Sequence, residues 1–292
     1  MHRVTLAGFA VVVLWASAFP AIQVVVPRIG VEQLVFLRLF VAAIVLVALA
    51  PFLKVRAPQR RDLVLILTCA FCGTAAYQYL LNWGELNVPA GATSLIVGAA
   101  PIFSAGIAVV VFREKLTRLR LVGSAVALIG VIVVCLARSG VEYTASVWIV
   151  VAAAIAQGIY HPLTKPLLQR YNAHELATYM MVAGAAMSLP VFLFSDHSSL
   201  AGQDFAGWGA VAYLGALPSA LGFVLWGYAT SRLPTTVSTS MLYLVPAVAV
   251  LIALIWLNEV PRVLEVIGGA VVLAGVVVIT LDNRPRPARA ES

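Results

Sequence analysis

Long uninterrupted blocks of apolar residues constrain this chain more than any other feature of its sequence. Each block is about 20 residues long, which is the length at which an α-helix crosses about 30 Å of hydrocarbon. Of the 292 residues, 62% are hydrophobic and 11% are charged, whereas soluble domains carry about 25% charged residues. The sequence therefore predicts an all-α integral membrane protein, because a β-barrel would show short alternating segments instead.

Ten such blocks occur, joined by short connections with no inserted soluble domain. The predicted spans cover residues 4–26, 33–53, 63–83, 91–112, 119–137, 145–164, 175–195, 207–229, 236–257 and 263–281. The first block resembles a secretory signal peptide, since Ala16-Ser17-Ala18 has the small residues of a cleavage site. It runs on to Val26, however, which is longer than a signal core, so we expect it to remain as the first span.

The distribution of basic residues predicts the orientation. Of the 19 Lys and Arg residues, fifteen lie in the segments on the same side as the N-terminus and three lie in the segments on the other side. The remaining one, Arg38, lies within the second span. Short cytoplasmic connections carry the excess of Lys and Arg, so both termini are expected in the cytoplasm of a bacterial-type inner (plasma) membrane. Topology thus explains the net charge of +7, and no nucleic-acid partner is implied.

The last two spans of each half repeat one another in sequence. Residues 101–136 align without a gap on residues 246–281, with 13 identities in 36 positions. Upstream, residues 14–23 match residues 155–164 more weakly. We therefore divide the chain into a first five-helix repeat at 1–138, a second at 139–283 and a basic tail at 284–292. Because five is odd, the second repeat enters the membrane from the opposite side. Inverted repeats suit alternating access to a site near the midplane.

Each repeat closes with the pattern P-x(12)-E-x(8)-G-x(6)-G. The matching residues are Pro101, Glu114, Gly123, Gly130 and Pro246, Glu259, Gly268, Gly275. With "LWASAFPAIQ" in the first span, this pattern resembles the EamA-type transporters of the drug/metabolite transporter superfamily, over essentially the whole chain. Within that family the chain is similar to the YddG-like exporters of aromatic and other amino acids. The resemblance implies ten helices around a central cavity lined by spans 1, 3, 4, 6, 8 and 9, with spans 5 and 10 as scaffold.

Polar and aromatic residues within the expected lining spans are the candidate substrate-binding residues. They are Trp15, Ser17, Tyr77, Gln78, Asn82, Ser94, Gln157, His161, Trp226, Ser240 and Tyr243. Each has an ordinary alternative role, because Trp and Tyr also sit at membrane interfaces and Ser packs helices together. Together they predict a neutral pocket with aromatic walls.

Two residues within spans carry or can acquire charge. His161 lies four residues after Gln157 on the same helix face, and it can bind a substrate carboxylate, carry a proton or simply pack between helices. Arg38 lies near the outer end of its span, so we expect it to extend to the interface or to have a structural role. No Asp or Glu lies deep within a predicted span, which argues against proton coupling through a carboxylate.

These features predict a secondary or facilitative transporter that exports amino acids, aromatic and other neutral ones, or similar small metabolites. We expect no enzymatic activity, no cofactor and no metal; Cys69 and Cys72 fit helix packing better than a zinc site. The expected partners are a small-molecule substrate and the lipid bilayer, and the expected state is a monomer or weak homodimer. The alternatives are broad-specificity export of amphipathic drugs or toxic compounds and a membrane-embedded enzyme, for which no acid–base cluster is visible.

Overall fold

The computed structural model describes residues 2–100, 102–104, 106–107, 117–137, 141–232, 241–242 and 244–282. These residues form helices and connections. The α-helices are α1 (His2–Ile29), α2 (Val31–Leu53), α3 (Leu63–Ala70), α4 (Ala76–Glu85), α5 (Ala90–Val97), α7 (Arg118–Leu136), α8 (Val141–Leu168), α9 (Ala173–Phe194), α10 (Ser198–Ala201), α11 (Phe205–Leu214), α12 (Gly222–Thr230), α14 (Leu244–Leu257) and α15 (Val263–Asp282). A 3₁₀ turn, η1 (Arg60–Asp62), precedes α3, and two π-helical turns, η2 (Phe71–Ala75) and η3 (Gly215–Leu221), join α3 to α4 and α11 to α12.

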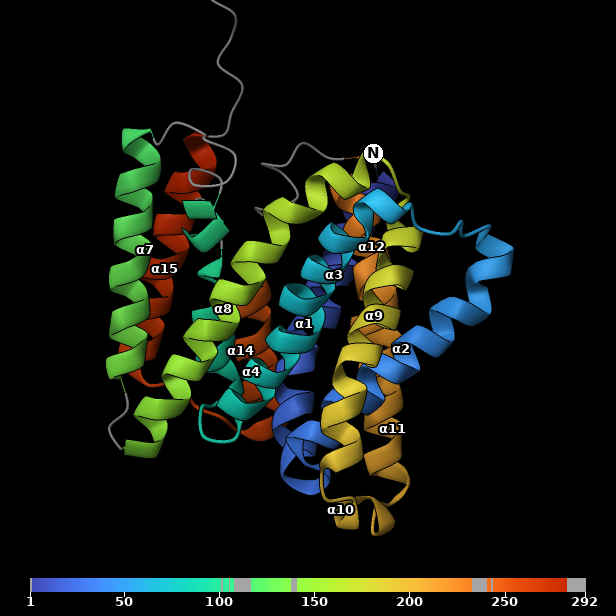
Figure 1. Ribbon diagram of the computed structural model, residues 1–292. Coiled ribbons are helices and arrows are strands. Elements are labelled where there is room, and N and C mark those ends of the chain that lie inside the picture. The colour runs from blue at the N-terminus through green and yellow to red at the C-terminus, as the bar shows by residue number, and fades with distance from the viewer. Residues whose placement is uncertain are drawn as a thin grey trace, which may run out of the picture.

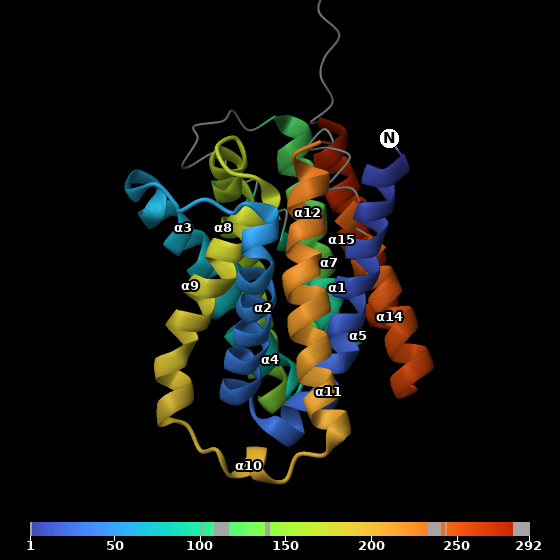
Figure 2. The ribbon, with the colours of Figure 1, turned by 90° about the vertical axis from the view of Figure 1, so that its right-hand side faces the viewer.

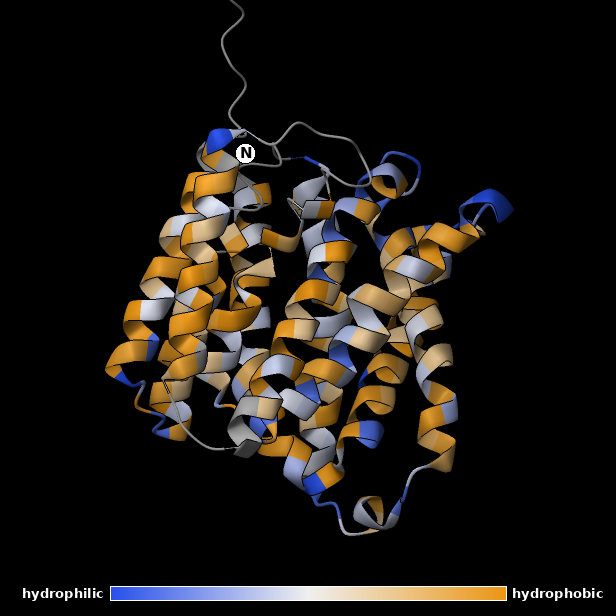
Figure 3. Ribbon diagram, turned by 60° about the vertical axis from the view of Figure 1, so that its left-hand side comes forward, coloured by the Kyte–Doolittle hydropathy of each residue, from blue (hydrophilic) through white to orange (hydrophobic). Residues whose placement is uncertain are grey.

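Six helical segments of the described chain are long and apolar enough to cross a membrane. They are Val4–Ile29, Val31–Leu53, Arg60–Glu85, Ala145–Leu168, Ala173–Phe194 and Phe205–Thr230. Shorter apolar helices occupy the positions of the other four predicted spans. The all-helical class is therefore confirmed, whereas the count of ten crossings stays a prediction. Hydrophobic residues cover most of the helix lengths and hydrophilic residues gather mainly near the two ends of the bundle (Figure 3).

The first two helices are joined by one residue, which makes the connection shorter than predicted. α1 continues to Ile29 and α2 begins at Val31, so Gly30 alone turns the chain. Gly30 has a φ of 93°, a conformation that residues with a Cβ atom rarely adopt. The next connections along the chain alternate between the two ends of the bundle (Figure 1).

The neighbours of each helix repeat between the two halves. In the first half, α1 packs against α12 and α14; in the second half, its counterpart α8 packs against α4 and α5. Likewise α2 packs against η3 of the second half, and α9 packs against η2 of the first. Corresponding helices run in opposite directions, since α1 starts at the end of the bundle where α8 finishes (Figure 1). This exchange of neighbours is what two repeats related by an axis in the membrane plane produce.

Spans 5 and 10, which the resemblance implies are scaffold, pack on each other as α7 on α15. The two helices are antiparallel, because Gly130 faces Gly268, Gly275 faces Ala127 and the Arg262 side chain donates to the Ala137 carbonyl. The start of α7 and the segment 258–262 therefore lie at opposite ends, as inversion requires. The pair stands at one side of the bundle (Figure 1), while α2 and α9 pack together elsewhere in it (Figure 2).

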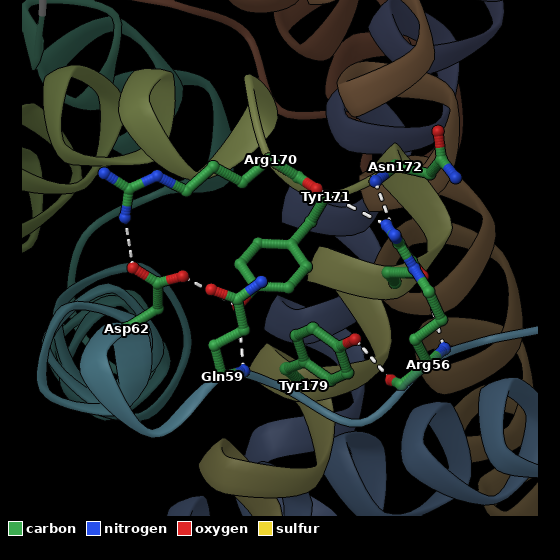
Figure 4. A network of polar contacts seen from close by, with 8 residues as sticks. Arg56, Gln59, Asp62, Arg170, Tyr171, Asn172 and Tyr179 are labelled. Carbon is green, nitrogen blue, oxygen red and sulfur yellow. Dashed lines mark hydrogen bonds and ion pairs between the residues drawn. The ribbon is translucent and has the colours of Figure 1, made fainter.

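A network of polar side chains ties the two halves together at the N-terminal end (Figure 4). The Arg56 guanidinium donates to both carboxylate oxygens of Glu175 at 2.7 and 3.0 Å, and this bonding raises the pKa of Arg56. Arg170 pairs with Asp62, which also accepts a hydrogen bond from the Tyr171 hydroxyl at 2.8 Å. The segment between α2 and α3 is thereby fixed to the segment between α8 and α9.

A second set of hydrogen bonds joins the start of α2 and the end of α1 to the segment that follows α9, at the opposite end of the bundle. The Gln33 amide donates to the Ser195 hydroxyl at 3.2 Å, and the Ser199 hydroxyl donates to the Ile29 carbonyl at 2.7 Å. The Gln203 amide donates to the Arg28 carbonyl at 2.9 Å. The antiparallel helices α2 and α9 are thus tied near both of their ends.

Substitution of Gly275 by Ala should destabilise the protein, because the new Cβ would lie 2.4 Å from the Ala127 nitrogen and 2.6 Å from the Gly123 carbonyl oxygen. Overpacking of this kind costs about 1–3 kcal/mol. Gly209 of α11 is the matched control, since a Cβ there meets nothing within 4 Å. Thermal unfolding in detergent should show a lower melting temperature for Gly275→Ala only; equal shifts would contradict the close packing of α7 on α15.

Removal of the Arg56 side chain should also lower the melting temperature, because Glu175 is buried and would lose the cation that satisfies its carboxylate. Arg60→Ala is the control, since Arg60 lies in the same connection and is exposed. Thermal unfolding of both variants at pH 7 compares them. If Arg56→Ala were as stable as Arg60→Ala, the pair would not hold this end of the bundle together.

Candidate functional site

A cluster of aromatic side chains lies between the two halves of the protein. Trp15 of α1 contacts Phe223 and Trp226 of α12, with ring centroids 5.6 Å apart in each case. His161 of α8 lies 6.0 Å from Trp226, and Tyr160 lies 5.2 Å from His161 and 6.0 Å from Phe223. The structure thus brings together three predicted residues, Trp15, His161 and Trp226, from helices far apart in sequence.

The two π-helical turns position this aromatic cluster. The indole nitrogen of Trp15 donates to the Pro218 carbonyl of η3 at 3.0 Å. On the other side, Tyr160 packs so closely on Gly73 of η2 that a Cβ atom there would lie 2.4 Å from its ring. The cluster is therefore held between a π turn of the first repeat and a π turn of the second.

The π turns occupy equivalent positions in the two repeats, and the sequence analysis missed both. Residues 71–75 fall on residues 216–220 at the offset of 145 that aligns the repeats, within η3. Pro218 lacks an N–H and would clash in a regular α-helix, while the Thr74 hydroxyl donates to the Ala70 carbonyl and competes with backbone bonding. π turns within α-helices are frequent at functional sites, and Pro218 was the available signal.

Arg38 lies inside the protein, so of its two expected roles, at the membrane interface or in the structure, the first is excluded. Its side chain is buried, and it donates from Nε to the Ser219 hydroxyl at 2.7 Å and from Nη1 to the Gln78 amide oxygen at 2.9 Å. Within the described part of the chain it forms no ion pair. A guanidinium thus adjoins the aromatic cluster through the consecutive residues Pro218 and Ser219, and the neutral pocket stays a prediction.

Glu85 is a buried acidic residue that lies just beyond the predicted third span. It is the last residue of α4 and only 3% exposed. Neither of its carboxylate oxygens has a hydrogen-bond partner, and the same holds for both polar side-chain atoms of the buried Asn82. The predicted third span ended at residue 83, so Glu85 was assigned to a connection. The helix extends two residues further and carries it into the interior.

The other predicted residues have more varied surroundings. The Ser17 hydroxyl donates to the Leu14 carbonyl and lies 2.6 Å from the Tyr213 hydroxyl, while the Ser94 hydroxyl donates to the Gly91 carbonyl of its own helix. Tyr77 is half-buried on α4 within electrostatic reach of Arg38. Gln157 is buried, and its side-chain oxygen has no partner. Ser240 and Tyr243 lie outside the described residues. In the described part of the chain no group of His, Cys, Asp and Glu could hold a metal.

Comparisons with known proteins agree with this architecture. The sequence pattern of the EamA-like transporter family matches residues 3–136 and again residues 144–281. A "Probable terminal-alkyne amino-acid exporter" from Streptantibioticus cattleyicolor is 48% identical and covers 94% of this chain and 93% of its own. A "Probable amino-acid metabolite efflux pump" from Salmonella typhimurium is 26% identical and covers 94% of each chain. A solved crystal structure shares the fold, with a TM-score of 0.69 at 20% identity over 98% of this chain and 99% of that one.

The fold and the two repeats define a multi-pass membrane transporter. The chain belongs to the EamA-like transporter family of the drug/metabolite transporter superfamily, so the resemblance seen in its sequence is confirmed.

Replacing Trp15 by Phe keeps an aromatic ring and removes the N–H that bonds to Pro218. Loss of one such hydrogen bond should lower the free energy of unfolding by about 1 kcal/mol. The control is Trp148→Phe, because Trp148 is 65% exposed and makes none of the ring contacts that form the cluster. Unfolding in detergent measures both variants, and indistinguishable stabilities would mean that the bond to η3 does not fix the indole.

Proposed function

We propose that this protein exports neutral amino acids, including aromatic ones, as a secondary or facilitative transporter. Two relatives support the substrate class, since the names of both describe the export of amino acids or their metabolites. One of them is 48% identical to this chain over almost its full length. No ATP-binding motif is present in the sequence, so the energy comes from the solute gradients rather than from nucleotide hydrolysis.

The buried Arg38 is the observation that carries this proposal. An unpaired cation within a membrane protein costs several kcal/mol, and such residues generally serve the transported solute. Gln78 and Ser219 fix the guanidinium through two of its N–H donors. The remaining donors of a guanidinium suit the two oxygens of a carboxylate, which every α-amino acid carries.

The aromatic cluster supplies the complementary surface for the amino-acid side chain. Trp15 donates a hydrogen bond to the Pro218 carbonyl, and Arg38 donates one to the hydroxyl of the next residue, Ser219. The π turn η3 therefore connects the aromatic rings with the guanidinium. Rings present flat apolar faces that accept aliphatic and aromatic groups alike. A substrate held by its carboxylate at Arg38 would place a neutral side chain against these rings.

The two inverted repeats provide the transport cycle. Because α1, α8 and their partners exchange neighbours between the halves, the two repeats can exchange conformations and open the site to either side in turn. The excess of basic residues supports an orientation in which the N-terminal end of the bundle, with the Arg56–Glu175 pair, faces the cytoplasm. For the site to open to one side, the interactions that tie α2 to α9 at that end must break while those at the other end remain.

Purified protein in liposomes should transport labelled L-phenylalanine and L-leucine with saturable kinetics. Arg38→Gln should raise the KM by at least about tenfold, since loss of an ionic hydrogen bond costs about 1.5–3 kcal/mol. Arg28→Gln is the matched control, because Arg28 is an exposed cation at the end of α1.

Absence of saturable flux for any neutral amino acid would contradict the proposed substrate class. Transport of amphipathic dyes in the same liposomes, unaffected by Arg38→Gln, would instead support broad-specificity drug export.

A further inference from the structure

The end of α4 holds a set of polar atoms that no group in the described part of the chain satisfies. Both carboxylate oxygens of Glu85 and both the amide oxygen and nitrogen of Asn82 are shielded from solvent and without hydrogen-bond partners. Asn82 is fully buried and Glu85 nearly so. A buried polar group without a partner costs about 1–3 kcal/mol, and a charged group costs more. A structure retains such atoms where a ligand supplies the missing partners.

These atoms lie on the face of α4 that also holds Gln78, which accepts a hydrogen bond from Arg38 of α2. Gln78, Asn82 and Glu85 are separated by four and three residues, so their side chains fall on one face of α4. The rise from Gln78 to Glu85 is about 10 Å, and side chains tilt toward the helix N-terminus, which brings the carboxylate back toward Gln78. Because Gln78 is bonded to Arg38, a cation and a carboxylate lie along one line on this face.

Arg38 and Glu85 are both buried, and no salt bridge joins them. Glu259, in the segment before α15, is the other charged group of the described chain that acts on Glu85, and its charge is negative. The surroundings of Asn82 and Glu85 therefore favour a cationic ligand, whereas those of Arg38 favour an anionic one.

We propose that Asn82 and Glu85 bind the α-ammonium group of the transported amino acid while Arg38 binds its carboxylate. This inference rests on the proposed function and names the substrate class as zwitterionic α-amino acids. An ammonium carries only N–H donors and so matches the acceptors on Asn82 and Glu85. A zwitterion would join the two groups with a charge-assisted hydrogen bond at each end, about 2.8 Å long.

The shielding of these atoms fits a site that opens alternately. In the present conformation the ammonium site is covered, and α2 is tied to α9 at both ends. Substrate would reach Glu85 when one of these ends opens.

The test uses three related compounds in proteoliposomes: L-phenylalanine, N-acetyl-L-phenylalanine, which lacks the ammonium, and phenylethylamine, which lacks the carboxylate. Glu85→Gln should raise the KM for L-phenylalanine and the inhibition constant for phenylethylamine by at least about tenfold. It should leave inhibition by N-acetyl-L-phenylalanine unchanged, and Arg38→Gln should show the reverse pattern. Glu32→Gln, at a half-buried carboxylate at the start of α2, is the matched control.

The pattern across the three compounds separates a binding role from a merely structural one, which would affect all three alike. If Glu85→Gln does not fold, Glu85→Asp replaces it; this variant keeps the charge, moves it back by one methylene and should raise the KM while retaining inhibition by phenylethylamine. The proposal would be overturned if Glu85→Gln left the KM for L-phenylalanine unchanged and altered only the response of transport to a pH gradient. That result would assign Glu85 a role in proton binding. Loss of all amino-acid flux in the unmodified protein would refute the proposed function instead.

Discussion

The absence of water from the hydrocarbon core is the constraint on which the whole structure depends. Every backbone N–H and C=O in that region needs a partner within the protein, so the described segments in the core are helical. The two departures from regular α-helix, η2 and η3, are placed where other helices pack on them. Tyr160 covers Gly73 in one, and Trp15 bonds to the Pro218 carbonyl in the other. The same constraint makes each buried side-chain charge costly and therefore informative about function.

Inversion of one structural unit explains how a single sequence pattern generates both the framework and the site. Packing of α7 on α15 brings corresponding glycines of the two copies together, and their lack of a side chain allows the backbones to touch. The π turns arise at equivalent positions and meet the aromatic cluster from two sides. The arrangement of charge is nevertheless asymmetric, since Arg38 belongs to the first repeat and its hydrogen-bond partner Ser219 belongs to the second. The repeats thus share one framework, whereas individual side chains differ between them.

The aromatic residues of the candidate site were predictable from the sequence, whereas its buried charged residues were not. Trp15, His161 and Trp226 were identifiable because polar and aromatic residues are scarce within apolar spans, and the structure brings them together. The burial of Arg38 and Glu85 was not predicted, for a common reason. Both lie close to predicted span ends, where a shift of two residues or a rotation of the helix decides whether a side chain meets water, lipid or protein. Ser94 stays a prediction, and its hydroxyl bonds to its own helix.

The sequence by itself determined the helical membrane class, the positions of the apolar segments, the repeat and the family. These properties are local or periodic along the chain, since the length of an apolar block and the spacing of Pro, Glu and Gly need no knowledge of partners. Only the tertiary structure decided that Arg38 bonds to Gln78 and Ser219, 40 and 181 residues away, and that Asn82 and Glu85 lack partners. The physical reason is that burial and pairing of charge depend on the rotation and relative placement of several helices, which hydrophobic length does not encode.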